Sequence, residues 1–381
     1  MRKSVLCFVD YYYPGFKGGG PIKSTFNLVN ELGDYIDFYI LTRGFDLGEQ
    51  KLYSNIIFGE WNQVGKAKVY YFTPSELKKF KVLRIINQNK VDTYYFNSFF
   101  SFYFSILPFL YISIMTKVKD LGSIVIAPRG EFSISALKSK YFKKKIVLKI
   151  ITLCLPLKLI KWHSTSVHEK DDIERLIKPQ NGNIINLPNF VSLHYSVPHI
   201  NFNSLRKEAV FFSRIVPHKN LDFLLCVLQS VRSIWHLDIY GTIEDKVYWE
   251  KCLDLIKKLP KNITVQYKGE INTESAYFIL PKYSLFILPT KGENFGHVIS
   301  EALNCSVPVL ISDLTPWKQI DNEALKVLSL DRINDWSEFL DSFSEFDNNK
   351  VKNIKIKAFQ TSLLTLSFTE ELKKQTLYFF S

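Results

Sequence analysis

Two glutamates, Glu293 and Glu301, are separated by seven residues in the stretch PTKGENFGHVISEAL (residues 289–303). The stretch continues an apolar run, LFILPT, that is typical of a buried strand, and it then changes to a helical pattern. We expect the helix to begin near Phe295 or Gly296, so that its first N–H groups are free to bind an anion. The two carboxylates could then reach hydroxyl groups on opposite sides of that anion. A nucleotide sugar has this layout, with sugar hydroxyls, a diphosphate and ribose hydroxyls in order.

A second loop supplies positive charge. Arg214 and Lys219 lie five residues apart in SRIVPHKN (residues 213–220), which follows the apolar run EAVFF. Ligands of open parallel sheets bind beyond the carboxyl ends of the strands. Two cations in such a loop suit a diphosphate, although a loop with solvated charges would show the same sequence.

A third loop, YYYPGFKGGGP (residues 11–21), follows the first apolar run of the chain. Its consecutive glycines, Gly18, Gly19 and Gly20, would let backbone N–H groups approach an anion closely. The pattern is neither G-x-G-x-x-G nor a P-loop with its Lys-Ser/Thr pair. A ligand-binding loop and a simple tight turn are therefore equally compatible with it.

The elements that must position these loops alternate along the chain. Short apolar runs separated by helical patterns predict parallel sheets covered by helices on both faces. The predicted strands are residues 4–10, 35–42, 66–72, 92–96, 123–128, 161–166 and 183–188 in the first half, and 208–213, 236–241, 263–269, 285–290, 308–312 and 325–330 in the second. We therefore predict an α/β protein with two doubly wound, Rossmann-like domains.

The predicted boundary lies in the polar, aperiodic stretch of residues 189–208. We predict a first domain over residues 1–195, a linker over 196–207 and a second domain over 208–365. The final segment, residues 366–381, is predicted to be a helix that can cross back to the first domain.

Composition agrees with a globular protein of two domains, because the 381 residues are 46% hydrophobic and 23% charged. The start, MRKSVLCFVDYYYP, has too short an apolar run for a signal peptide and fits a first buried strand. The five cysteines show no C-x-x-C spacing, which indicates free thiols in a reducing cytosol. No H-E-x-x-H or similar motif occurs, and no metal site is predicted.

The net charge of +12 is concentrated in one region. No acidic residue occurs between Phe132 and His168, and eight lysines are interleaved there with apolar residues: Lys138, Lys140, Lys143, Lys144, Lys145, Lys149, Lys158 and Lys161. This pattern favours adsorption to an anionic membrane surface. A solvated lysine face over a core helix is the alternative, and nucleic acid is not expected because no recognition motif accompanies the charge.

One further stretch, Phe96–Met115, is twenty residues long and uncharged. Its length makes it a candidate for a membrane span. It follows a predicted strand and contains Pro108 and several polar residues, so a buried helix is favoured. A helix that dips into the membrane and a true span remain the alternatives.

In their order along the chain these motifs resemble retaining glycosyltransferases of family 4, which have the GT-B fold, in which two Rossmann-like domains face a central cleft. The E-x7-E signature corresponds to Glu293 and Glu301, and the diphosphate-binding Arg-x4-Lys pattern corresponds to Arg214 and Lys219. Further similar segments are the glycine loop, PRGE at Pro128–Glu131, TS at Thr165–Ser166, LPNF at Leu187–Phe190 and TPW at Thr315–Trp317.

The resemblance implies a role for each matching residue. Glu293, Arg214 and Lys219 would be the catalytic residues. Glu293 would hold hydroxyls of the transferred sugar, and the two cations would offset the charge of the leaving diphosphate. The donor would also be bound by Gly18, Gly19, Gly20, Gly241, Lys268, Gly269, Asn294, Phe295, Gly296, His297 and Glu301, the last through the ribose diol. The acceptor side would include Arg129, Glu131 and Asn97, which stands where many members of the family carry histidine.

The implied activity is transfer of a sugar from a UDP- or GDP-sugar to a glycan. The acceptor would be a lipid-linked oligosaccharide of bacterial O-antigen, capsule or exopolysaccharide synthesis. No D-x-D motif occurs in the sequence. We therefore expect a metal-independent reaction without a cofactor, in which Arg, Lys and a helix N-terminus supply the positive charge. The protein would be cytoplasmic and peripheral at the inner face of the plasma membrane.

Three other functions fit the same residues less well. In a glycosidase the two glutamates would be an acid/base pair, and an epimerase would use a nucleotide sugar on the same architecture. A non-catalytic GT-B subunit that binds sugar or membrane and supports another enzyme is the main alternative. The presence of Glu293, Arg214 and Lys219 argues against it.

Overall fold

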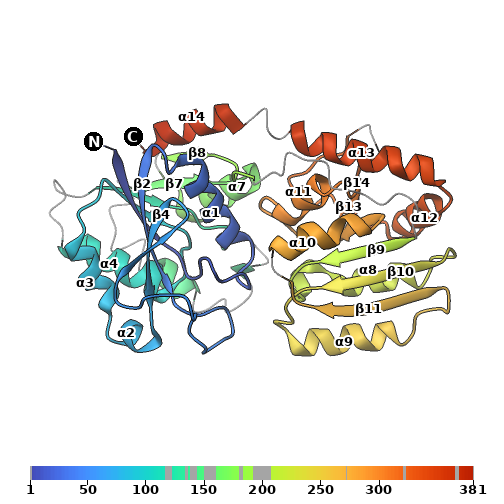
Figure 1. Cartoon of the computed structure of the whole chain (residues 1–381), viewed down its shortest axis with the longest axis horizontal. Helices are drawn as coiled ribbons and strands as arrows, with labels where there is room; N and C mark the ends of the chain where they lie inside the picture. Colours follow the sequence, from blue (N-terminus) through green and yellow to red (C-terminus); the bar gives the residue numbers. More distant parts are fainter. Residues whose placement is uncertain are drawn as a thin grey trace. The chain divides into compact units, whose positions relative to one another are not determined.

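The computed structural model describes residues 2–115, 122–133, 136–137, 144–149, 160–179, 183–191, 207–271, 273–320, 323–364 and 369–380. Two compact units make up the chain. One comprises Met1–Phe190 with Thr369–Ser381, and the other comprises Val191–Phe368. Each unit contains one sheet with helices packed against it (Figure 1). The prediction of an α/β protein with two doubly wound parallel sheets is confirmed.

The first sheet has eight strands in the order β3-β4-β2-β1-β5-β6-β7-β8. The strands are β1 (Lys3–Phe8), β2 (Ile36–Arg43), β3 (Trp61–Val64), β4 (Ala67–Phe72), β5 (Thr93–Phe96), β6 (Ser123–Ile126), β7 (Ile160–Ser164) and β8 (Ile184–Asn186). All neighbours are parallel except β3, which forms an antiparallel pair with β4. The sequence did not indicate β3, because WNQV lacks the apolar run by which the other strands were recognised.

Helices cover both faces of this sheet. They are α1 (Gly20–Leu32), α2 (Pro74–Lys78), α3 (Lys81–Gln88), the π-helix η1 (Phe102–Ile106), α4 (Leu107–Met115), α7 (Val167–Ile177) and α14 (Thr369–Phe380). Successive side chains of a strand point to opposite faces. Accordingly, Leu6 and Phe8 of β1 belong to one buried cluster, whereas Val5 and Cys7 belong to the other.

Helix α14 belongs to the first unit although it is the last element of the chain. Phe379 and Phe380 are buried in the same cluster as Val5, and the Phe380 ring lies 5.6 Å from the ring of Tyr95. Lys161 Nζ of β7 also donates to the carbonyl oxygen of Phe379 at 3.3 Å. These contacts attach the C-terminal helix to the first sheet (Figure 1).

The uncharged stretch Phe96–Met115 is not one continuous helix. It contains the end of β5, a loop, and the short helices η1 and α4, which have five and nine residues. Phe104, Phe109 and Ile112 are buried, so part of the stretch forms core as predicted. Among the residues that the structure describes, none of the helices combines the length and the apolar character needed to cross a membrane.

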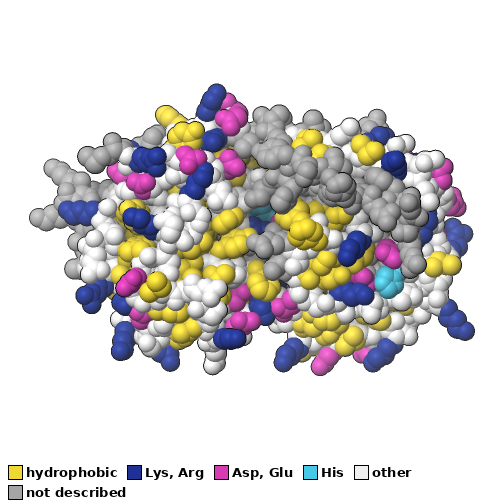
Figure 2. Space-filling model, viewed as in Figure 1, with side chains coloured by type: hydrophobic (Ala, Val, Ile, Leu, Met, Phe, Trp, Pro, Cys, Tyr) yellow, Lys and Arg dark blue, Asp and Glu magenta, His cyan; other side chains and the backbone are white. Residues whose placement is uncertain are grey.

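Four of the eight lysines of the lysine-rich region lie outside the described residues, namely Lys138, Lys140, Lys143 and Lys158. On the face shown in Figure 2, the described Lys and Arg side chains are interspersed with acidic and hydrophobic ones. Cys7, Cys226, Cys252 and Cys305 are free thiols, as expected, and Cys154 lies outside the described part of the chain.

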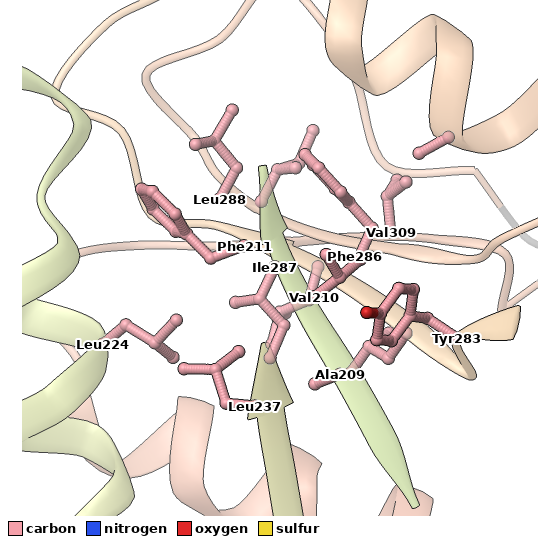
Figure 3. Packing of buried hydrophobic residues seen from close by; sticks show 14 of the residues in the cluster. Ala209, Val210, Phe211, Leu224, Leu237, Tyr283, Phe286, Ile287, Leu288 and Val309 are labelled. Atoms are coloured by element: carbon pink, nitrogen blue, oxygen red, sulfur yellow. The ribbon is translucent and has the colours of Figure 1, made fainter. Parts of the chain in front are cut away.

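The second sheet has six parallel strands in the order β11-β10-β9-β12-β13-β14. They are β9 (Glu208–Phe212), β10 (Trp235–Tyr240), β11 (Ile263–Gly269), β12 (Leu285–Leu288), β13 (Val309–Ser312) and β14 (Leu325–Leu328). The central strands β9 and β12 are adjacent, with Val210 opposite Phe286. Figure 3 shows how apolar side chains from these strands and from α8 fill the interior of the unit.

Helices pack against both faces of this sheet as well. They are α8 (Leu221–Leu228), α9 (Lys246–Ile256), α10 (Thr273–Ile279), α11 (His297–Asn304), α12 (Ile333–Ser344) and α13 (Asn348–Leu364). Helical patterns in the sequence begin near residues 220, 244, 274, 296 and 334, and five of these helices start within two residues of those positions. The sixth, α13, was not predicted. Its Lys355 is fully buried and donates to the carbonyl oxygens of Pro281 and Tyr283 at 2.9 and 2.6 Å.

Both sheets have a point at which the strand order reverses. In the second sheet, the chain moves outward from β9 to β11 and then returns to begin again at β12, on the other side of β9. In the first sheet the same reversal lies between β1 and β5. Loops that leave the two strands at such a point diverge and leave a crevice at the carboxyl edge of the sheet, which is where ligands of doubly wound folds bind.

Candidate active site

The loops after β9 and β12 meet at the reversal point of the second sheet. The loop after β9 contains Arg214 and Lys219, and the loop after β12 contains Glu293 and leads into α11. The two loops are therefore neighbours because of the strand order, although they are far apart in sequence. The three residues that the resemblance implies to be catalytic therefore lie on two adjacent loops.

The loop after β9 continues the pairing of the strands before it turns. Ser213 N donates to Tyr240 O at 3.0 Å, and Ile215 N donates to Thr242 O at 2.8 Å. A single turn of 3₁₀-helix, η5 (Pro217–Lys219), then leads into α8. This backbone pairing fixes the position of Arg214, which lies between the two bonded residues.

Gly241 makes this close pairing possible. Its φ is 145°, and a Cβ atom added there would lie 1.8 Å from the carbonyl oxygen of Ser213. No other residue could occupy the position without moving the backbone. Gly241 N also donates to Gly269 O at 2.9 Å, so these two predicted donor-binding glycines lie side by side at the ends of β10 and β11.

His218 joins the two loops. Its Nε2 donates to the carbonyl oxygen of Gly292 at 2.8 Å, and its own carbonyl oxygen accepts from Lys291 N at 2.8 Å. Burial lowers the pKa of His218, and the charge of Lys219 lowers it further. The imidazole is therefore neutral near pH 7, with the proton on Nε2. His218 lies inside the SRIVPHKN motif, but its role was not predicted because its partner is 74 residues away.

Lys219 and Glu293 form an ion pair between the loops. Their side chains are only 12% and 13% exposed. Glu293 is also fixed through its backbone, because its N–H donates to Leu314 O at 3.2 Å. The ammonium and the carboxylate are thus held in contact at the crevice, where low exposure strengthens their interaction.

Arg214 is more exposed and has a different partner. Its Nη1 donates to both carboxylate oxygens of Glu244, at 3.0 and 3.1 Å. The two side chains are 42% and 25% exposed. Glu244 was not among the predicted site residues, because it follows β10 rather than β9 or β12 and belongs to no motif.

Helix α11 begins shortly after Glu293 in the sequence. Gly296 is its N-cap, with φ of 79°, and an added Cβ would lie 2.8 Å from Ile299 Cδ1. Trp317 Nε1 donates to Phe295 O at 2.6 Å, and the rings of Phe295 and His297 lie 4.8 Å apart. The turn that contains the predicted residues Asn294, Phe295, Gly296 and His297 is thereby fixed at the N-terminus of the helix.

Several polar side chains of the helix are buried, among them those of Ser300 and Glu301. Glu301 is only 7% exposed, and Ser300 Oγ is buried without a hydrogen-bond partner among the described residues. The partly positive N-terminal end of a helix favours anions. The N-terminus of α11, Lys219 and Arg214 are therefore three sources of positive charge on the loops of one sheet edge.

Lys268 contacts residues of its own strand and of the neighbouring strand β10. Its Nζ lies 3.7 Å from Asp238 Oδ1, in the middle of β10, and it also donates to Gln266 Oε1 at 2.5 Å. The side chain therefore points back along the sheet, because residues two apart on a strand share a face.

In the first unit, the predicted glycine loop connects β1 to α1. Gly19 is the N-cap of α1, and Gly20 is its first residue. The preceding residues are held by Asp46, whose Oδ2 accepts from Phe16 N at 2.9 Å and from Lys17 N at 3.2 Å. The loop thus has a defined conformation at the reversal point of the first sheet.

The predicted acceptor-side residues bond mainly to one another and to neighbouring loops. Arg129 Nε donates to Asn97 Oδ1 at 2.6 Å, and its other nitrogens donate to Asn189 Oδ1 at 2.7 Å and to Tyr95 OH at 2.8 Å. Asn97 is 4% exposed. These contacts link the PRGE segment to the strand end at Asn97 and to the LPNF segment.

Glu131 has a similar environment. Its carboxylate accepts from Ser98 Oγ, Phe99 N and Phe100 N at 2.8, 2.7 and 3.1 Å. Burial raises the pKa of Glu131, and these three donors act in the opposite direction. The carboxylate is therefore occupied in holding the loop after β5.

A buried histidine that the sequence did not single out extends this network. Tyr95 OH lies 2.8 Å from His163 Nδ1, and His163 Nε2 lies 2.8 Å from the carbonyl oxygen of Leu187. Burial lowers the pKa of His163 to about 3, so the imidazole is neutral. Nε2 then carries the proton and donates to Leu187 O, and Nδ1 accepts from Tyr95 OH. Within the described residues, no group of three or more His, Cys, Asp or Glu is placed to hold a metal ion.

The chain is similar to several known proteins. Residues 198–343 match the family model of glycosyl transferases group 1, and this range contains the loops after β9 and β12. Over 122 residues the chain is 27% identical to O-antigen chain mannosyltransferase B of Escherichia coli. That match covers 30% of this chain and 31% of the relative, so the chain spans about a third of the length of this curated relative.

Solved structures match over nearly the whole chain. The sucrose-phosphate synthase of Thermosynechococcus elongatus has a TM-score of 0.75 at 13% identity, with 98% of this chain and 97% of that chain covered. Anabaena HepE, in complex with UDP-glucose, has a TM-score of 0.69 at 14% identity, with 98% and 99% covered. The chain therefore has the GT-B fold of these proteins. Together with the family match, these structures support the class of glycosyltransferases for this protein.

Proposed function

We propose that the protein is a retaining glycosyltransferase that moves a sugar from a UDP- or GDP-sugar to a glycan acceptor. The observation that carries the proposal is the meeting of two loops at the reversal point of the second sheet. One loop brings Arg214 and Lys219, and the other brings Glu293 and the N-terminus of α11. HepE, which has the same fold, is known in complex with UDP-glucose.

In the proposed reaction, an acceptor hydroxyl oxygen forms a bond to C1 of the sugar. The bond between C1 and the β-phosphate oxygen breaks, and the nucleoside diphosphate leaves with the electron pair. The hydroxyl proton passes to the departing phosphate on the same face, so that the anomeric configuration is retained. No protein nucleophile is assigned, and the protein contributes by binding and by stabilising charge.

The leaving diphosphate develops negative charge as the C1–O bond breaks. Arg214 and Lys219 would offset this charge, together with the N–H groups of the first turn of α11. Glu293 would accept hydrogen bonds from hydroxyls of the transferred sugar, and Glu301 from the ribose diol. Because the sequence has no D-x-D motif and offers these positive groups instead, we propose that transfer does not require a metal ion.

The acceptor is proposed to be a lipid-linked glycan of a bacterial surface polysaccharide. The relative in E. coli is named as an O-antigen chain mannosyltransferase, and its match lends support to this class of acceptor. The lysine-rich region and the net charge of +12 favour a peripheral position at an anionic membrane surface on the cytoplasmic side. Replacement of the exposed Lys145 and Lys149 by glutamate should then reduce binding to anionic vesicles.

The first experiment is a titration of the purified protein with UDP, GDP and their sugars in EDTA, followed by calorimetry. Binding of one nucleotide that is much weaker in Glu301→Ala and Arg214→Ala would support the proposed donor site. A ligand at a hundred times its Kd should also add about 2.7 kcal/mol to the stability. If the folded protein binds no nucleotide, the proposed assignment of the donor site is wrong. The protein is then better described as a non-catalytic subunit.

A further inference from the structure

Arg214, which is proposed to bind the diphosphate of the nucleotide, is already paired with a carboxylate. Arg214 Nη1 donates to both oxygens of Glu244, at 3.0 and 3.1 Å. Glu244 belongs to none of the motifs that indicated the site, yet it is the partner of the more exposed of the two cations.

The backbone, rather than a chance side-chain conformation, places Glu244 beside Arg214. The chain after β9 and the chain after β10 continue as a parallel pair, with a bridge between Ile215 and Ile243. Arg214 precedes the first of these residues and Glu244 follows the second. Their backbones are held together by the bond from Ile215 N to Thr242 O at 2.8 Å.

The pair balances the charge of the site. Arg214 and Lys219 contribute two positive charges, and Glu244 and Glu293 contribute two negative charges, so these four side chains sum to zero. The Lys219–Glu293 pair is little exposed, whereas both members of the Arg214–Glu244 pair are partly exposed. Exposed pairs are weak, and an arriving anion can therefore exchange with the carboxylate at little cost.

We propose that Glu244 competes with the diphosphate for Arg214 and thereby limits the affinity for the nucleotide. The inference rests on the proposed donor site. In the free protein Glu244 holds Arg214 in place, and on binding the diphosphate takes over the guanidinium. When the nucleoside diphosphate product leaves, Glu244 binds Arg214 again, which favours release.

The test is a double-mutant cycle on nucleotide binding. The Kd of whichever of UDP and GDP binds the wild-type protein more tightly is measured for Glu244→Gln, Arg214→Gln and the double variant. Glutamine keeps the size of the glutamate side chain and removes its charge. Glu250→Gln, in the exposed part of α9, is the matched control for loss of one negative charge, and thermal unfolding of every variant checks the fold.

Glu244→Gln should bind the nucleotide roughly three- to ten-fold more tightly, because a carboxylate that competes for the guanidinium has been removed. Glu250→Gln should leave the Kd unchanged. In the Arg214→Gln background, the gain from Glu244→Gln should fall below about two-fold.

An unchanged or weaker affinity of a folded Glu244→Gln variant would overturn the inference, because Glu244 would then only orient Arg214. An equal gain in both backgrounds would also overturn it, since Glu244 would act directly on the nucleotide. Failure of the wild-type protein to bind either nucleotide would instead refute the proposed function, and the inference with it.

Discussion

His218 and Gly292 are joined by a hydrogen bond of 2.8 Å, from the imidazole Nε2 to the carbonyl oxygen. One residue lies in the loop that carries the cations, and the other lies in the loop that carries Glu293. The bond therefore couples the two halves of the proposed donor site. The imidazole is neutral and donates through the proton on Nε2. Burial, which lowers the pKa of His218, keeps it in that state.

Replacement of His218 by alanine should weaken nucleotide binding about ten-fold, because the loops lose their connection and the Gly292 carbonyl loses its donor. The stability should fall by about 1–2 kcal/mol. Calorimetry and chemical unfolding measure the two effects. His218→Gln, whose amide can donate to the same carbonyl, should restore part of the affinity. An equal loss of affinity in His218→Ala and His218→Gln would show that the hydrogen bond to Gly292 does not contribute to nucleotide binding.

Replacement of Lys219 by glutamine should slow transfer strongly while the protein remains folded. The change removes a cation from the proposed diphosphate site and leaves the carboxylate of Glu293 without its partner at low exposure. We expect a loss of about 2–4 kcal/mol in transition-state stabilisation, measured as kcat/KM. Lys291→Gln, at an exposed position in the other loop, is the control. A Lys219→Gln variant with nearly normal kcat/KM would remove Lys219 from the catalytic residues.

Arg129 should contribute mainly to the stability of the first unit. Arg129→Ala leaves the side-chain oxygens of Asn97, Asn189 and Tyr95 without their donor, which should cost about 2–4 kcal/mol. Nucleotide binding should be unchanged, because Arg129 bonds to none of the residues that are proposed to bind the donor. Chemical unfolding and calorimetry distinguish the two effects, with Lys90→Ala as an exposed control. A fully stable Arg129→Ala variant that binds the nucleotide but no longer transfers sugar to the acceptor would favour the acceptor-side role of Arg129.

Acid should destabilise the protein through His163. Its pKa is about 3 in the folded state and near 6.5 when unfolded. Between these values the unfolded chain binds a proton that the folded chain does not, so stability falls as the pH drops below about 6.5. The loss should reach about 2 kcal/mol at pH 5. His163→Gln can keep both hydrogen bonds, and its unfolding free energy should depend less on pH in this range. If the unfolding free energies of the wild-type protein and His163→Gln depend on pH in the same way, His163 is not the cause of the acid effect.

Alkaline pH should have the opposite effect through Lys355. Burial lowers the pKa of its ammonium to about 8, from 10.5. Between these values the unfolded chain binds the extra proton, so stability should rise from pH 8 to 10.5, by about 3 kcal/mol at most. Below pH 8 Lys355 contributes no pH dependence. The buried thiols of Cys7, Cys252 and Cys305 have raised pKa values and act in the opposite direction in both proteins. The measurement is therefore the difference in unfolding free energy between the wild-type protein and Lys355→Met, which should grow in favour of the wild type from pH 8 to 10.5.

Much of the fold could be predicted from the sequence because its signals are local. Apolar runs followed by helical patterns indicated the parallel strands of both sheets and the starts of five helices in the second unit. They also placed Arg214, Lys219 and Glu293 just after strands, where the structure has them. The antiparallel β3 and the helix α13 were missed. WNQV has no apolar run, and α13 alternates lysines with apolar residues without a clear start signal.

The partners of the site residues were decided by the tertiary structure. Glu244 pairs with Arg214 across 30 residues, His218 bonds to Gly292 across 74, and Arg129 bonds to Asn97 across 32. The sequence determined which residues follow the strands, because hydrophobic periodicity acts within one element. It could not determine which loops become neighbours, because that depends on strand order and register. Only the folded sheets brought a carboxylate to Arg214 and a histidine between the two loops.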